Sequence, residues 1–282
     1  MGSRRIGVRR VEALVDNLLD HGTLNGINGS QFVLCDPDKY HLEEWFSRRP
    51  ALNASLGAAF NLDFELLGAN ASNDDITYSA TSAGIQLQTD GSDNDSIIIL
   101  PHLDTNQSAW TGCKWGTENQ VQWECLIRTD ASIADMGIWA GLKLTNVPDY
   151  ADDADQVYFL YDASDDAGAL TTNANLHAVV SIGGTDYITD LGIAVAAATN
   201  YRLAITIDSD RKASVFVNGV QYSLTQATTA GGAAVSPAKG VAKSLALTND
   251  INLIPYVGVI ARTGSAKTLH LSYEKISRII FE

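Results

Sequence analysis

The feature that most constrains this chain is a strand-like alternation that begins near residue 61 and continues to the C-terminus. Apolar and polar residues alternate in one short run after another, as in 84–89 and 201–208. A period of two places the apolar side chains on one face of a β-strand. Asn218-Gly219 separates two such runs and predicts a tight hairpin. About a dozen short strands without interleaved helices predict an all-β sandwich or barrel.

The expected strands share short length, alternation or continuous apolar character, and Gly, Pro, Asn or Asp at their ends. They are residues 61–67, 84–89, 96–100, 122–128, 136–144, 156–161, 176–182, 185–190, 201–208, 212–217, 220–224, 253–262 and 268–278.

Composition excludes several functional classes. A formal net charge of −14 argues against a general nucleic-acid binder, which needs basic residues to neutralise phosphates. No apolar stretch approaches the roughly 20 residues that cross a bilayer, so we expect neither a membrane segment nor a membrane partner. The three cysteines lack paired spacing, which predicts reduced thiols rather than a zinc site or a disulfide framework.

The first 54 residues differ from the rest and are interpreted as a basic arm preceding a sandwich over residues 55–282. Apolar residues such as Leu14 and Leu18 follow helical spacing, and a short amphipathic helix needs a surface to pack on. That surface is either the chain's own sandwich or a partner, because the basic arm complements the acidic body of another copy. The arm residues expected to bind a partner are Arg4, Arg5, Arg9, Arg10, Leu14 and Leu18.

A second helical turn is expected near the end of this arm, over residues 40–46. His41, Glu43 and Glu44 lie close together there, but without a second cluster they are interpreted as a solvated helix face. Trp45 and Phe46 are expected to pack against the body.

Two consecutive strands carry a resemblance to a known family. Tyr201 to Asp208 is an aromatic-led strand ending in Asp, and Val215 to Val220 contains the Asn-Gly hairpin. Together they resemble the concanavalin A-like, laminin-G-like jelly-roll family. The resemblance covers about residues 57–282 and implies an antiparallel jelly-roll β-sandwich, in front of which the apolar spacing predicts the short N-terminal helical arm. Other segments that fit the family's order are 63–65, 122–125, 141–144, 254–259 and 269–273.

An arginine-rich arm joined to such a sandwich resembles structural proteins of tailed bacteriophages. The resemblance implies a non-enzymatic virion protein, most simply a head decoration or cement protein that binds capsid proteins and sister subunits as a homo-oligomer. Its location would be the virion, assembled in the host cytoplasm. The Ala/Gly/Thr/Ser-rich segment 225–242 is too long for a hairpin turn and is interpreted as a second tie between subunits. The alternative is a lectin-like module of a tail or fibre protein that binds host glycans.

The sequence contains no recognisable group of catalytic residues. Asp63 and Glu65 share one strand face, but glycoside hydrolysis needs a matched carboxylate pair about 5 Å apart and no third carboxylate supports them. We therefore expect no enzymatic activity.

Two binding features remain as hypotheses. The acidic residues Asp152, Asp153 and Asp155 offer oxygen ligands suited to calcium, although the Asp-x-Asp-x-Asp-Gly loop is missing and solvated turns are the alternative. Trp110 and Trp115 flank a Gly-containing loop and are the candidate glycan contacts, with core packing as the alternative.

Overall fold

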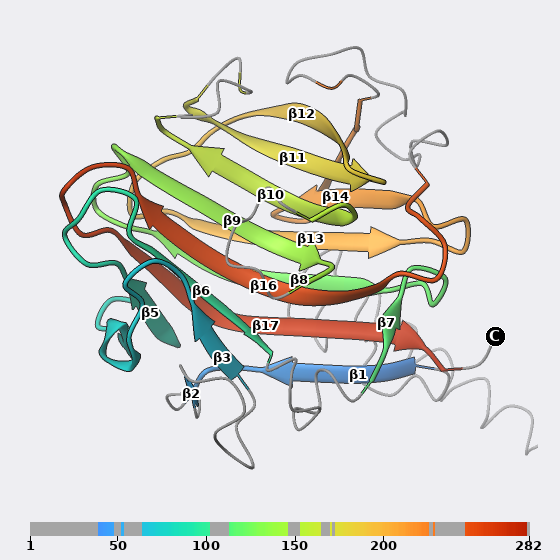
Figure 1. The fold of residues 1–282 in the computed structure, drawn as a ribbon, viewed down its shortest axis with the longest axis horizontal. Coiled ribbons are helices and arrows are strands. Elements are labelled where there is room, and N and C mark those ends of the chain that lie inside the picture. The colour runs from blue at the N-terminus through green and yellow to red at the C-terminus, as the bar shows by residue number, and fades with distance from the viewer. Residues whose placement is uncertain are drawn as a thin grey trace, which may run out of the picture.

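The fold is an all-β sandwich of two large sheets (Figure 1). This computed structural model describes residues 39–47, 52–53, 64–101, 113–145, 153–164, 170, 173–225, 228 and 246–280. Among the strands of these residues, every pair is antiparallel except β2 with β3, which is parallel. The helical arm predicted for the N-terminus, with its arginines and with Leu14 and Leu18, lies outside the described residues.

The first sheet is eight-stranded. In spatial order it contains β15 (Val220–Tyr222), β14 (Ala213–Val217), β13 (Asn200–Ile207), β8 (Gln122–Thr129), β17 (Thr268–Ile279), β5 (Ile85–Gln88) and β4 (Ile76–Tyr78), with β1 (Lys39–Glu44) also paired to β17. A short 3₁₀ helix at Asn73–Asp75 precedes β4.

The second sheet is nine-stranded. In spatial order it contains β12 (Thr185–Ala194), β11 (Asn175–Ile182), β10 (Gln156–Asp162), β9 (Met136–Lys143), β16 (Asn252–Ala261), β6 (Ser96–Pro101), β3 (Phe64–Leu67) and β2 (Leu52–Asn53), with β7 (Trp115–Gly116) paired to the start of β16.

The main core lies between the two sheets and follows from the alternation in the sequence. Leu203, Ile205 and Ile207 of β13 are buried while the residues between them are partly exposed. They join a cluster of buried residues from both sheets, including Trp123 and Phe159. Burying such a set is the dominant favourable contribution to folding.

A β-bulge in β17 interrupts this alternation. The register against β8 shifts between Leu271 and Tyr273, which inserts one extra residue into β17. Leu269 and Leu271 therefore face the core before the bulge, whereas Ile276 faces it afterwards. The shift turns Glu274 inward, where its Oε1 accepts a hydrogen bond from Trp123 Nε1 at 2.8 Å.

Most of the predicted strands are confirmed, but the helical turn predicted over residues 40–46 is wrong. Lys39–Glu44 is the strand β1, paired residue by residue with β17 from Lys39↔Ile279 to Glu44↔Glu274. Phe46 is fully buried in the main core. Pairing with a long neighbouring strand has overridden a helix-like local sequence, so residues 39–46, assigned to the arm, belong to the sandwich.

The segment 225–242, predicted to link subunits, is described at its first residue. Thr225 is buried and its backbone N–H donates to Thr189 Oγ1 at 2.9 Å; apart from residue 228, the rest of the segment lies outside the described residues. In the described parts of the chain, no helix has the length and apolar character that would let it span a membrane.

Candidate functional site

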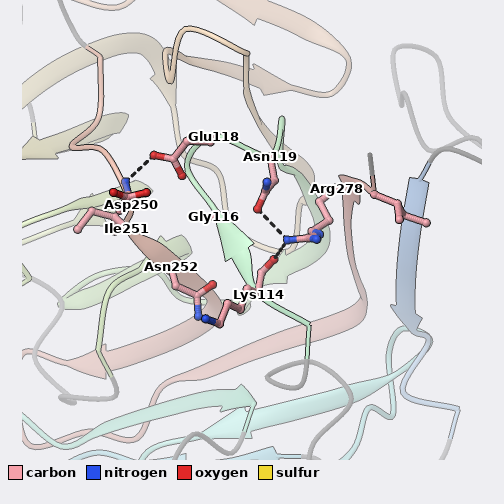
Figure 2. A pocket seen from close by; sticks show the side chains of 9 residues that line it. Lys114, Gly116, Glu118, Asn119, Asp250, Ile251, Asn252 and Arg278 are labelled. Atoms are coloured by element: carbon pink, nitrogen blue, oxygen red, sulfur yellow. Dashed lines mark hydrogen bonds between the residues drawn. The ribbon is translucent and has the colours of Figure 1, made fainter. Parts of the chain in front are cut away.

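A polar cavity opens at one end of the sandwich. Its volume is about 750 Å³. It lies where β16 begins, β17 ends and the short strand β7 crosses between them (Figures 1 and 2). Its lining residues are Lys114, Gly116, Glu118, Asn119, Asp250, Ile251, Asn252, Arg278 and Ile280.

One wall is built by joining the 117–119 turn to the segment that leads into β16. The backbone N–H of Thr117 donates to the Ile251 carbonyl at 2.9 Å, and its hydroxyl donates to the Thr248 carbonyl at 2.9 Å. Asn252 completes the joint, because its Oδ1 accepts the backbone N–H of Trp115 at 2.6 Å. These bonds fix two segments that lie more than a hundred residues apart in the chain.

The opposite wall is held by Arg278, near the end of β17. Its Nη1 donates to the Lys114 carbonyl at 2.6 Å and to Asn119 Oδ1 at 2.7 Å (Figure 2). The Asn119 carbonyl accepts the backbone N–H of Ile279 at 3.0 Å. A guanidinium that bridges two acceptors loses little further freedom when a ligand arrives.

Glu118 lies across the cavity from Arg278 and is an ionised acceptor at neutral pH. Partial burial acts to raise its pKa, but hydrogen bonds from backbone N–H groups, first that of Asp250, lower the pKa below its ordinary value. A carboxyl group with a lowered pKa suits hydrogen-bond acceptance rather than proton donation.

The cavity thus combines three kinds of polar group with an apolar margin. The amides of Asn119 and Asn252 can both donate and accept, carboxylates only accept, and cations only donate. Ile251 and Ile280 add aliphatic surface, and Ile280 is 40% exposed. A neutral, polyhydroxylated ligand matches this set better than a purely apolar or a purely charged one.

Trp115 lies beneath this cavity rather than facing it. Its side chain is fully buried, and its ring lies 5.9 Å from that of Tyr40. Trp115 is therefore not the exposed glycan contact that was one of its two predicted roles. It packs in the core, which was the other. Trp110 lies outside the described residues.

The predicted calcium ligands are already occupied by protein groups where they are described. Asp153 Oδ2 accepts the backbone N–H groups of Leu144 and Thr145 at 2.9 and 3.0 Å and lies 3.8 Å from Lys143 Nζ. Asp155 Oδ1 accepts the backbone N–H of Thr248 at 3.2 Å. Asp152 is outside the described residues, and the part of the chain on view contains no group of three His, Cys, Asp or Glu side chains placed to hold a metal.

The other candidate carboxylates do not form a site. Glu65 is fully buried on β3, and Asp63 is outside the described residues. The cavity residues themselves went unpredicted, because they come from three segments that only the β7–β16 pairing and the end of β17 bring together. The available signal was the polar, turn-forming composition of 116–119 and 248–252.

Comparison with known proteins shows the fold. No protein-family model and no curated protein sequence matches the chain. The structure resembles that of a protein of unknown function from Shewanella oneidensis MR-1, with a TM-score of 0.51, 11% identity, and 91% and 92% of the two chains covered. It also resembles the carbohydrate recognition domain of Emp47p, with a TM-score of 0.52, 10% identity, and 87% of this chain and 100% of that chain covered. The jelly-roll sandwich expected from the sequence is thereby supported.

Proposed function

We propose that this protein is a carbohydrate-binding module whose polar cavity holds one end of a glycan. The observation that carries the proposal is the cavity of about 750 Å³ lined by amides, carboxylates and cations. Its size is within the roughly 300–1,000 Å³ usual for small-ligand pockets, and its mixed donors and acceptors suit sugar hydroxyls. The fold shared with the carbohydrate recognition domain of Emp47p supports the same class of function.

Binding without turnover fits the groups in the cavity. Glycoside cleavage needs an acid with a raised pKa beside a second carboxylate, whereas the pKa of Glu118 is lowered. We infer that the cavity carboxylates accept hydrogen bonds from hydroxyl groups.

A glycan array followed by calorimetry tests this function. The variant combines Lys114→Ala with Ile280→Ser, because Ile280 is exposed and no hydrogen bond described here uses the Lys114 ammonium. We expect at least about a tenfold loss of affinity. The matched control combines Asp74→Ala with Val220→Ser, two exposed positions away from the cavity. Unchanged binding in the cavity variant, or no binding across broad arrays, would contradict the proposal.

A virion location is a second candidate, and it depends on the charge contrast between the four arginines of the first ten residues and the rest of a protein whose net charge is −14. A head decoration protein would lose co-sedimentation with phage capsids when residues 1–38 are deleted. Glycan binding by the cavity would survive that deletion, so the two proposals can be tested separately.

A further inference from the structure

The outer face of the eight-stranded sheet carries a half-exposed tryptophan that is firmly supported from below. Trp45 follows β1 directly and is 49% exposed. Its ring centroid lies 4.9 Å from that of Tyr273, with the planes tilted by 49°. A large aromatic ring left half open to solvent and held in one position is a common feature of binding surfaces.

Lys275 fixes both rings. Its Nζ lies 4.6 Å from the Trp45 centroid and 4.7 Å from the Tyr273 centroid, so one ammonium makes two cation–π contacts. The lysine itself is only 5% exposed. Its position is a product of the β17 bulge, which turns Tyr273 and Lys275 to the outer face.

Carboxylate residues lie opposite this lysine on both neighbouring strands, and one of them forms an ion pair with it. Its partner on β1 is Glu43 and its partner on β8 is Glu124, and the Lys275 Nζ to Glu43 Oε2 distance is 3.8 Å. Glu124 Oε1 also accepts the Tyr273 hydroxyl at 2.7 Å. Glu43, in turn, lies 3.4 Å from His41 Nε2. The cluster is therefore preorganised, and its lysine is paired with a carboxylate.

We propose that Trp45 is a second sugar-binding position, on which the C–H face of a neutral pyranose ring stacks. An indole ring presents apolar area that suits the C–H groups of a sugar ring, and the nearby Glu43 and His41 offer its hydroxyls hydrogen bonds. Acidic glycans are disfavoured, because Lys275 is already paired and the protein has a net charge of −14. The sugar class rests on the proposed carbohydrate-binding function, but the residues are separate from the polar cavity.

The test uses the full-length protein with neutral β-linked hexasaccharides of glucose and mannose, and with alginate and pectate oligomers as charged comparators. Affinity is measured by calorimetry, and tryptophan fluorescence is recorded in parallel. We expect Trp45→Ala to weaken neutral-sugar binding by about tenfold or more and Trp45→Phe to stay within about threefold of the parent. Tyr78→Ala, at another exposed aromatic residue, is the matched control and should bind like the parent.

Three results would overturn the proposal. The first is parental affinity in Trp45→Ala, and the second is tighter binding of acidic than of neutral oligosaccharides. The third is a Trp45→Ala variant that only converts a dimer to a monomer in light scattering, which would make this surface a contact between copies. A loss seen in the Lys114→Ala, Ile280→Ser variant but not in Trp45→Ala leaves the cavity proposal standing and removes this one. The reverse pattern removes the cavity proposal alone, and no sugar binding at all removes both.

Discussion

The outer faces of the two sheets differ in how much apolar side-chain surface they bury. On the nine-stranded sheet, Trp139, Tyr158 and Tyr256 belong to a second buried apolar cluster. On the eight-stranded sheet, the outward residues of β17 are Tyr273, Lys275 and Ser277, set among carboxylates. In the nine-stranded sheet β10 is buried on both faces, whereas in the eight-stranded sheet β13 alternates between buried and more exposed residues.

The difference indicates that one outer face serves mainly stability and the other presents a surface for recognition. The apolar outer cluster contributes burial, and Leu170, from the connection between β10 and β11, is part of it. The buried side chains of the polar outer face include charged groups such as Glu124 and Lys275, and this face holds Trp45 half exposed in a network of ion pairs and cation–π contacts. Three measurements test this contrast.

The largest expected effect is the loss of a buried aromatic residue from the apolar outer face. Trp139 is 1% exposed, so Trp139→Ala should lower the free energy of unfolding by about 3–5 kcal/mol. Phe216→Ala, at a partly exposed position of β14 outside both buried clusters, is the control and should cost about 1 kcal/mol. Urea denaturation measures both, and equal losses would show that the two outer faces contribute alike.

The next effect is a pH dependence from Glu274, on the inner face of the eight-stranded sheet. Burial raises its pKa to about 7, although the Trp123 hydrogen bond acts to lower it. The folded protein keeps a proton that the unfolded chain releases above about pH 4.5. Stability is therefore fully present below that value and falls by about 3 kcal/mol as the pH rises through about 7.

Glu274→Gln isolates this contribution. Subtracting its unfolding free energy from that of the parent between pH 4.5 and 8.5 removes the titrations that the two proteins share. A difference that does not change with pH would show that Glu274 is ionised in the folded state.

The smallest effect probes how tightly the apolar outer face is packed. A Cβ on Gly258 would lie 2.5 Å from Trp139 Nε1 and 2.7 Å from its Cε2, so Gly258→Ala should cost about 1–3 kcal/mol through overpacking. Gly91→Ala meets nothing within 4 Å and should stay within about 0.5 kcal/mol of the parent. A neutral Gly258→Ala would mean that the indole shifts freely and that the face is loosely packed.

The sequence predicted most strands because alternation and turn chemistry are local. Asn218-Gly219, for example, forms the predicted turn between β14 and β15, with φ above zero at both residues. It could not predict β1, because the strand exists through its pairing with β17 more than two hundred residues away. A helix-like run such as residues 40–46 is decided by that partner and not by its own composition.

The bulge explains why the sites were harder to predict than the fold. Unbroken alternation through 269–273 would place Tyr273 in the core and Glu274 outside. One inserted residue reverses both and builds the support beneath Trp45. The polar cavity was missed for a related reason, since its residues become neighbours only through long-range pairing and through the end of β17.

The antiparallel pairing of β1 with β17 also determines how the sandwich responds to mechanical load. Lys39 lies opposite Ile279 at one end of this ladder, so a pull applied between these two residues loads the β1–β17 ladder one residue pair at a time. Such a geometry opens like a zipper at low force, whereas strands pulled along their length resist together. If the protein tethers two bodies through these ends, β1 would detach first and extend the tether, and the cation–π support of Trp45 would be lost in the same step.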